Sequence, residues 1–208
     1  MKRSFLVMSF VLFASIPAMA QEYPKAELFG GYSYFRADGG ANLHGWNASV
    51  SGNLNSWFGL VVDFSGHYDS SSSRSELSFP PIPGFPDIPD FPPVSILVNS
   101  NTNVHTFLAG PRFSYRKKER ITPFAHALFG ASRRHAETEV ILDSGSRTFF
   151  SFNNTSFAAA LGGGLDVELS KNIALRLVQA DYLLTRAFGF NENNARVSTG
   201  IVFRFGNK

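Results

Sequence analysis

The last strand-forming stretch of the chain, residues 195–205, constrains the fold most strongly because its side chains alternate in character without a break. One face of an extended strand here carries Val197, Thr199, Ile201, Phe203 and Phe205. The other face carries Arg196, Ser198, Gly200, Val202 and Arg204, since successive side chains of a strand point to opposite sides. A terminal strand can bury both faces only if a sheet closes around it. We therefore predict that this strand seals a membrane-spanning β-barrel, with its aromatic face toward lipid and its arginines in the lumen.

The amino terminus has the features of a secretory signal peptide. Lys2 and Arg3 precede an apolar run over residues 5–16, which is too short to span a bilayer comfortably. Ala18 and Ala20 form a small-x-small cleavage site, so the mature chain is predicted to begin at Gln21. We therefore assign residues 1–20 to a signal peptide and residues 21–208 to one barrel domain.

Composition narrows the class further. Without Lys2 and Arg3 the 19 basic residues become 17, against 16 acidic ones, so no strong attraction to nucleic acid is expected. The chain has no cysteine, which excludes disulfides, and 22 phenylalanines give it a heavy apolar aromatic load. No stretch after residue 20 is apolar and long enough for a membrane helix. An exported, aromatic-rich, alternating sequence of this kind indicates an all-β barrel or sandwich.

Seven further strands are predicted before the last one. They cover residues 25–36, 43–52, 56–68, 94–115, 122–133, 157–169 and 173–186. Most are at least about 10 residues long, which a tilted strand needs to cross a bilayer. Phe124, Leu128 and Phe129 straddle both faces of the fifth strand, so the pattern leaves its orientation open.

The seventh strand breaks strict alternation. Arg176 falls on one parity, whereas Gln179 and Asp181 fall on the other. One extra residue near Val178 would return all three side chains to the same face, so we predict a β-bulge there.

The connections differ sharply in length between the two ends of the strands. Short turns are predicted at residues 53–55, 116–121 and 170–172, whereas residues 69–103 and 134–155 form long connections. The second of these is predicted to be a hairpin with its turn at residues 143–146, and residues 191–194 a shorter connection. Tight turns on one side and long loops on the other are typical of an up-and-down, eight-stranded antiparallel transmembrane β-barrel with long extracellular loops.

The connection over residues 69–103 is rich in serine and proline and contains an unusual repeat. Proline recurs every third residue from Pro80 to Pro92, and so do the apolar residues Phe79, Ile82, Phe85, Ile88, Phe91 and Val94. Polyproline II has three residues per turn, so this segment is predicted to form a ribbon with one apolar edge. That edge either docks a surface protein partner or lies against the barrel rim or membrane.

Charged residues recur on the face predicted to line the lumen: Glu27, Asp63, Arg112, Asp166, Glu168, Arg176, Asp181, Arg196 and Arg204. The interior of an eight-stranded barrel is only wide enough for its own side chains, so these charges are expected to pair and fill it. The pattern therefore favours a structural plug over a narrow ion-conducting pore. A soluble lipocalin-like binding barrel, in which the apolar face would point inward, is an alternative.

The carboxy-terminal motif Ser198-x-Gly200-x-x-Phe203-x-Phe205 resembles the assembly signal of outer-membrane proteins. With the strand count and loop asymmetry, the mature chain resembles the small barrels of the OmpA type and the OmpX-like proteins of Gram-negative bacteria. The resemblance implies a location in the outer membrane, contact with its lipid, and recognition by the barrel assembly machinery. Gly206, Asn207 and Lys208 follow the aromatic residue, and we expect no OmpA-type peptidoglycan-binding domain and no cell-wall tether.

Function is predicted to be structural or surface-interacting rather than enzymatic. Some small outer-membrane barrels modify lipid A, and His67, His105 and His135 are expected near the outer strand ends. They lack the spacing of a metal or catalytic motif, so we expect no catalytic residue, metal site or cofactor. The strands that run past the bilayer would instead offer a sheet edge to another chain, as in OmpX-like surface attachment.

Overall fold

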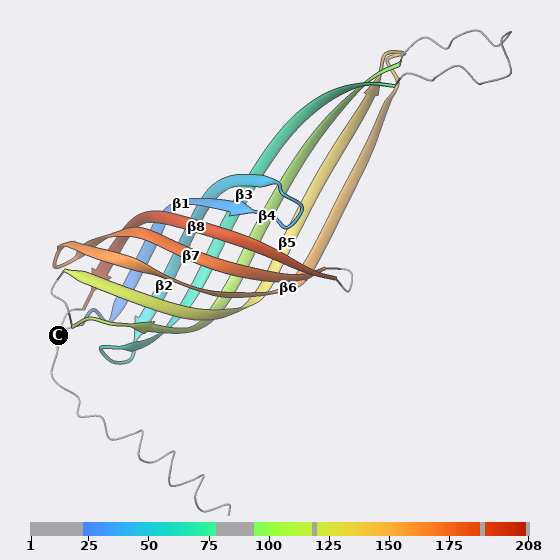
Figure 1. The fold of residues 1–208 in the computed structure, drawn as a ribbon. Coiled ribbons are helices and arrows are strands. Elements are labelled where there is room, and N and C mark those ends of the chain that lie inside the picture. Colours follow the sequence, from blue (N-terminus) through green and yellow to red (C-terminus); the bar gives the residue numbers. More distant parts are fainter. Residues whose placement is uncertain (1–22, 78–93, 118–119, 188–189, 207–208) are drawn as a thin grey trace, which may run out of the picture.

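The computed structural model describes residues 23–77, 94–117, 120–187 and 190–206, which form eight antiparallel strands in one closed barrel (Figure 1). The predicted signal peptide with Ala18, Ala20 and Gln21, and most of the proline ribbon, lie outside the described residues. The strands are β1 Ala26–Arg36, β2 Asn42–Asn53, β3 Phe58–Leu77, β4 Val94–Ser114, β5 Ile121–Leu142, β6 Arg147–Ser170, β7 Ile173–Ala187 and β8 Phe190–Phe205. The predicted fold class is confirmed.

The terminal strand closes the barrel as predicted. β8 pairs with β1 from Ala26 opposite Phe205 to Arg36 opposite Ala195. Phe203 is 44% exposed on the outer wall, whereas Arg196 and Val202 are completely buried inside. Closure pairs the backbone groups of both terminal strands, which a membrane-spanning sheet requires because lipid offers them no hydrogen bonds.

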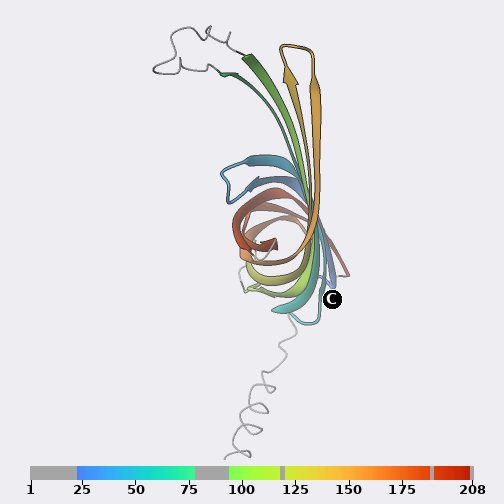
Figure 2. The same ribbon diagram turned by 90° about the vertical axis from the view of Figure 1, so that its right-hand side faces the viewer.

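Four strands are much longer than the others and continue beyond the barrel. β2 pairs with β3 only as far as Tyr68, and β7 pairs with β6 only as far as Phe157. Past these positions β3, β4, β5 and β6 still pair with one another. They form a protruding sheet that rises from one side of the barrel wall (Figures 1 and 2).

Two predicted connections are strand in the structure. Residues 69–77 are strand rather than loop, because they pair with residues 94–102 at the start of β4, where the fourth strand was predicted to begin. Residues 191–194 are also strand, since they pair with residues 183–186 of β7. The connection over residues 134–155 is a hairpin with its turn at residues 143–146, as predicted.

The predicted bulge in β7 is present. Asp166 lies opposite Arg176 and Leu165 opposite Val178, so Leu177 is the extra residue of the ladder. Leu177 and Val178 both lie on the outer wall, while Arg176, Gln179 and Asp181 are all buried. The bulge therefore brings the three polar side chains to one face.

The structure settles the orientation of β5, which the sequence left open. Phe124, His126 and Leu128 are buried inside the barrel, whereas Phe129 is exposed on the outer wall. Two aromatic residues thus lie on opposite faces of one strand. The ring of Phe124 inside the barrel contacts the guanidinium groups of Arg112 and Arg176.

Aromatic side chains surround the outer wall near both ends of the barrel. Tyr32, Trp46 and Tyr68 are exposed toward the protruding sheet, and the indole of Trp46 donates to the Tyr68 hydroxyl over 3.4 Å. Trp57 and Phe113 are exposed at the end with the short turns, and their rings stack. Amphipathic aromatic rings favour the membrane–water interface, so the two groups mark the limits of a lipid-facing band. Among the described residues, no helix is suited to crossing a membrane.

The backbones of β1 and β8 approach each other closely at Gly31. A Cβ atom on Gly31 would lie 2.0 Å from the carbonyl oxygen of Thr199, whereas one on Gly30 would meet nothing within 4 Å. Gly31→Ala is expected to destabilise the barrel by about 1–3 kcal/mol through overpacking, and Gly30→Ala to leave its stability nearly unchanged. Urea unfolding in lipid vesicles, followed by gel mobility without boiling, measures both. Equal stability of the two variants would contradict a tightly closed seam.

Candidate functional site

The lumen near the short turns holds an ion-pair group centred on Asp166. Arg176 donates through Nε to Asp166 over 2.8 Å, and Arg112 donates to the same carboxylate over 3.0 Å. Arg112 also lies 3.1 Å from Glu27. Arg204 lies 3.4 Å from Glu27 and 3.0 Å from Glu168, which is half-buried at the edge of the group. Each carboxylate faces at least one guanidinium, so the buried charges compensate one another.

A second group lies around Arg196, which is fully buried. Arg196 donates to Asp63 and to Asp181, each over 2.7 Å. Asp181 also accepts a hydrogen bond from Gln179 and lies 2.7 Å from the ring nitrogen of His126. One arginine from β8 thus joins acids from β3 and β7 across the lumen.

Interior aromatic rings cover the arginines of the first group. The guanidinium of Arg112 lies 4.0 Å from the ring centre of Phe124, and that of Arg176 lies 4.4 Å from the same ring. Arg176 is also 4.2 Å from the ring centre of Phe29. A guanidinium over a ring face is attracted by the ring's quadrupole, and this attraction is stronger where water is excluded.

All nine predicted lumen charges therefore lie in the interior, eight of them buried. Arg116, His126 and the interior aromatic residues were not predicted from the sequence to contribute to this interior. Arg116 projects from a short turn and lies 3.4 Å from Glu27. Burial lowers the pKa of the Arg116 guanidinium, and the neighbouring Glu27 carboxylate opposes this effect.

The paired interior charges are balanced. Five carboxylates, Glu27, Asp63, Asp166, Glu168 and Asp181, form ion pairs with five arginines, Arg112, Arg116, Arg176, Arg196 and Arg204. A set of paired charges that balance in this way has no large net field to draw ions through the lumen.

An apolar cluster fills the lumen beyond the charged groups, toward the protruding sheet. Its buried members come from seven of the eight strands: Phe35, Leu43, Val61, Val104, Leu108, Leu128, Ala158, Ala160 and Leu183. The interior of an eight-stranded barrel is only wide enough for its own side chains, so these residues pack together in the lumen. Close-packed apolar side chains leave no path for hydrated ions.

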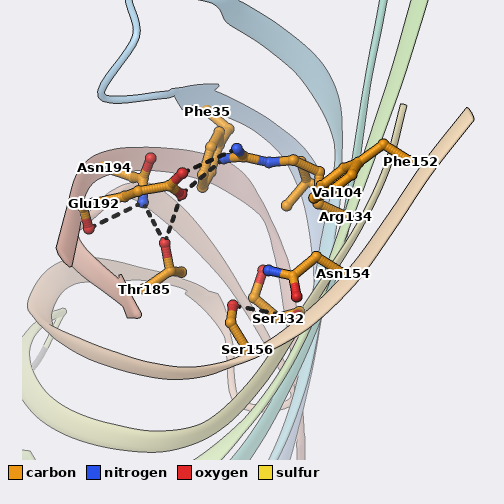
Figure 3. Close-up of a pocket in the computed structure, with 10 residues that line it drawn as sticks. All are labelled: Phe35, Val104, Ser132, Arg134, Phe152, Asn154, Ser156, Thr185, Glu192 and Asn194. Atoms are coloured by element: carbon orange, nitrogen blue, oxygen red, sulfur yellow. Dashed lines mark hydrogen bonds and ion pairs between the residues drawn. The ribbon is translucent and has the colours of Figure 1, made fainter. Parts of the chain in front are cut away.

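A small cavity lies above this cluster at the mouth of the barrel (Figure 3). Arg134 of β5 reaches across to Glu192 of β8 and donates two hydrogen bonds of 3.1 and 3.0 Å. Thr185 donates to the same carboxylate over 3.0 Å, and Phe35 lines the cavity. The cavity volume is about 30 Å³, which suits a water molecule but not an organic substrate.

The three predicted histidines do not form one site, although His105 and His135 line the same groove on the outer wall. His67 is buried in the lumen, where its ring lies 2.8 Å from the hydroxyl of Ser33. His105 and His135 are on the outer wall, His105 beside the Tyr68 hydroxyl and His135 3.1 Å from Glu137. Among the described residues, no cluster of three or more potential metal-ligating side chains is present.

The predicted assembly motif divides between the two faces of β8. Ser198 is buried in the lumen, while Phe203 and Phe205 are exposed on the outer wall near the short turns. Val94, the last apolar residue of the predicted ribbon edge, is the first residue of β4. Phe79, Ile82, Phe85, Ile88 and Phe91 lie outside the described residues.

The pairing of Asp166 with two buried arginines predicts a large effect of its neutralisation. Asp166→Asn leaves both guanidinium groups undercompensated, so we expect a loss of about 3–5 kcal/mol of unfolding free energy. Glu168→Gln removes the same charge at a half-exposed position and should cost below about 1 kcal/mol. Urea unfolding in vesicles, followed by tryptophan fluorescence, compares the two variants. Similar losses for both would show that the buried ion pairs do not stabilise the barrel.

Comparisons with known proteins agree with this architecture. Ail, the attachment invasion locus protein of Yersinia pestis, matches 88% of this chain and 99% of its own, with a TM-score of 0.54 and 18% identity. Neisserial surface protein A matches 86% and 96%, with a TM-score of 0.48 and 14% identity. A search of curated proteins finds no match. The family model of the outer membrane protein β-barrel domain matches residues 6–206, and the chain therefore belongs to this family of outer-membrane barrels.

Proposed function

We propose that this outer-membrane barrel is a closed, non-enzymatic scaffold that presents its protruding sheet to a partner outside the cell. The balanced ion pairs and the apolar cluster argue against a conducting lumen. Of the three histidines considered for a lipid-modifying enzyme, His67 is buried in the lumen, whereas His105 and His135 lie on the outer wall. The longest strands extend on the side opposite the short turns, which in such barrels face the periplasm.

The unpaired edge of β6 is the observation that carries the proposal. Glu168 donates from its backbone amide to Arg120, and Leu142 donates to Ser146, so even-numbered residues form the hydrogen-bonded pairs of β5 and β6. Odd-numbered residues of β6 therefore point their N–H and C=O groups away from β5. From residue 157 inward these groups meet β7, whereas residues 147–156 pair with β5 alone among the described residues.

The side chains along this edge are aromatic and exposed. Phe149 is 72% exposed, Phe150 61% and Phe152 39%. The opposite edge of the same sheet, in β3, carries the exposed serines of residues 70–73 instead. Large apolar groups along an open edge favour the addition of another strand, whereas small polar residues offer little to bury.

An extended segment that pairs with β6 would gain main-chain hydrogen bonds and cover these rings. The neighbouring side chains also provide a groove of about 230 Å³, which is lined in part by Glu137, Phe149 and Phe150. Ail, described as an attachment protein, shares the fold, so the fold is compatible with a role in attachment. The partner we propose is therefore a protein with an extended, partly apolar segment.

Two further parts of the proposal concern the two ends of the chain. We propose that Ser198, Gly200, Phe203 and Phe205 are read by the barrel assembly machinery, which the exposure of the two phenylalanines on the outer wall supports. We also propose that residues 1–20 are removed after Ala20. We further propose that the proline-rich segment over residues 79–94, which lies between β3 and β4 in the sequence, takes part in binding the same partner.

A proline scan of the two edges tests the proposal. Ser151→Pro removes an edge N–H and its ring obstructs pairing, while Ser70→Pro makes the same change on the β3 edge, where even-numbered residues face away from β4. The probe is a fluorescent peptide with the sequence of residues 136–142, which already pairs with the other side of β6. Flow cytometry of intact cells should show binding to the wild type and to S70P, and background signal for S151P. Equal binding by S151P and the wild type would show that the β6 edge is not the binding site.

A further inference from the structure

The side chains of the outer wall change from apolar to polar where the protruding sheet begins. One rung of the wall consists of Phe107 on β4, Ala131 on β5 and Phe157 on β6, and it belongs to the apolar band. The next rung outward places His105 opposite Arg133. Beyond it the same face carries Asn101 and Glu137, so the boundary between lipid and water lies at the rung of Arg133.

A shallow groove of about 510 Å³ lies across this boundary on β4, β5 and β6. It is lined by Asn103, His105, Phe107, Arg133, His135 and Asn153. Phe107 forms its apolar side and continues into the lipid-facing band, while the remaining side chains form a polar wall. A ligand that fits the groove therefore has an apolar part and a polar part joined at the depth of the interface.

Arg133 differs from the other arginines around the lumen and mouth. Its side chain is exposed, and the structure gives it no hydrogen bond or ion pair within the part of the chain that is described. The nearest carboxylate on the same strand, that of Glu137, is held by the ring of His135 at 3.1 Å, and His135 also contacts Asn153. Arg134, the next residue, forms an ion pair with Glu192 at the barrel mouth. The guanidinium of Arg133 thus remains available to an external anion.

A second exposed cation lies close to the groove. Arg186 of β7 is directly opposite Phe157 of β6, which itself lies opposite Ala131 of β5. Arg186 is also exposed and without a hydrogen-bond partner among the described residues. Two unpaired guanidinium groups therefore flank the exposed ring of Phe157 at the lipid boundary.

We propose that this groove binds the phosphate group of an outer-leaflet lipid. A guanidinium presents parallel N–H donors that match two phosphate oxygens, and Arg133 is free to make this contact. His105 lies beside it, and Arg186 offers a second positive charge near the same depth. The acyl chains run along Phe107 and Phe157, which a free phosphate ion could not use. The proposal requires only that the barrel lies in the membrane and is independent of the proposed surface role.

Lipid selectivity of charge variants tests this site. The purified barrel is examined by native mass spectrometry with phosphatidic acid and with phosphatidylcholine of the same acyl chains. The wild type should retain phosphatidic acid preferentially, and Arg133→Gln should reduce this preference about tenfold, the effect of losing a strong charge-assisted hydrogen bond. Arg147→Gln makes the same charge change at the far end of β6, where the side chain is 62% exposed, and should leave the preference unaltered.

Three results would overturn the proposal. R133Q could keep the full preference, or both variants could lose it equally, which would indicate unspecific attraction to the whole surface. Inorganic phosphate could also displace phosphatidic acid at equal concentration, which would indicate a site for free anions. Gel mobility without boiling verifies that R133Q folds, as expected for a substitution at an exposed position.

Discussion

The mutual neutralisation of charges inside a narrow, closed wall is the interaction on which the structure depends. Eight strands enclose a lumen that side chains fill, so an ionised group there finds little water and must find an opposite charge. Arg196 shows the consequence, because it is fully buried and bonded to two carboxylates from different strands. The barrel wall and the lumen charges therefore depend on each other. Closure of the barrel excludes water from the lumen, and ion pairing there offsets the cost of removing the charges from water.

The four long strands pass through two environments, and their side-chain pattern inverts between them. Within the barrel the outer face is apolar, as at Phe107 and Phe129, and the inner face is largely polar. Beyond the rung of Arg133 the outward face is mostly polar and carries Asn99, Asn101, Glu137 and Glu139, with Leu97, Ile141 and Phe149 as apolar exceptions. The other face carries Ile96, Val98, Val140 and Phe150. A strand cannot change its alternation, so a reversal of polarity along one strand marks the level at which the solvent changes. This reversal supports both the protruding sheet and the interfacial position of the lipid groove.

Much of the barrel could be predicted from the sequence because one strict period governs it. The faces of β8 and the bulge beside Val178 follow from parity alone, and the structure agrees with both. The orientation of β5 did not follow, since Phe124 is interior and Phe129 exterior, and residue type does not distinguish them. Phe124 is tolerated inside because Arg112 of the neighbouring β4 and Arg176 of β7, two strands away, lie against its ring.

The serine run after Tyr68 and the asparagines over residues 191–194 resemble loop sequences, yet both are strand. Serine and asparagine have weak strand preference by themselves, and pairing with a long neighbouring strand overrides it. Arg116 was missed as a partner of Glu27 because it projects from a turn, where side-chain parity carries no information. Sequence periodicity thus identifies faces, whereas partners across the lumen depend on the closed geometry.

The orientation of β8 in the bilayer provides a direct test of a closed barrel with apolar side chains toward lipid and charged ones in the lumen. The chain has no cysteine, so single-cysteine variants at Val197, Ser198, Ile201 and Val202 can each carry one nitroxide label without background. Oxygen concentrates in the bilayer interior, and its collisions shorten the relaxation time of labels that face lipid. We expect strong oxygen relaxation at Val197 and Ile201 and weak relaxation at Ser198 and Val202 in reconstituted bilayers. Strong relaxation at Ser198 and Val202, or no alternation along the strand, would contradict this orientation.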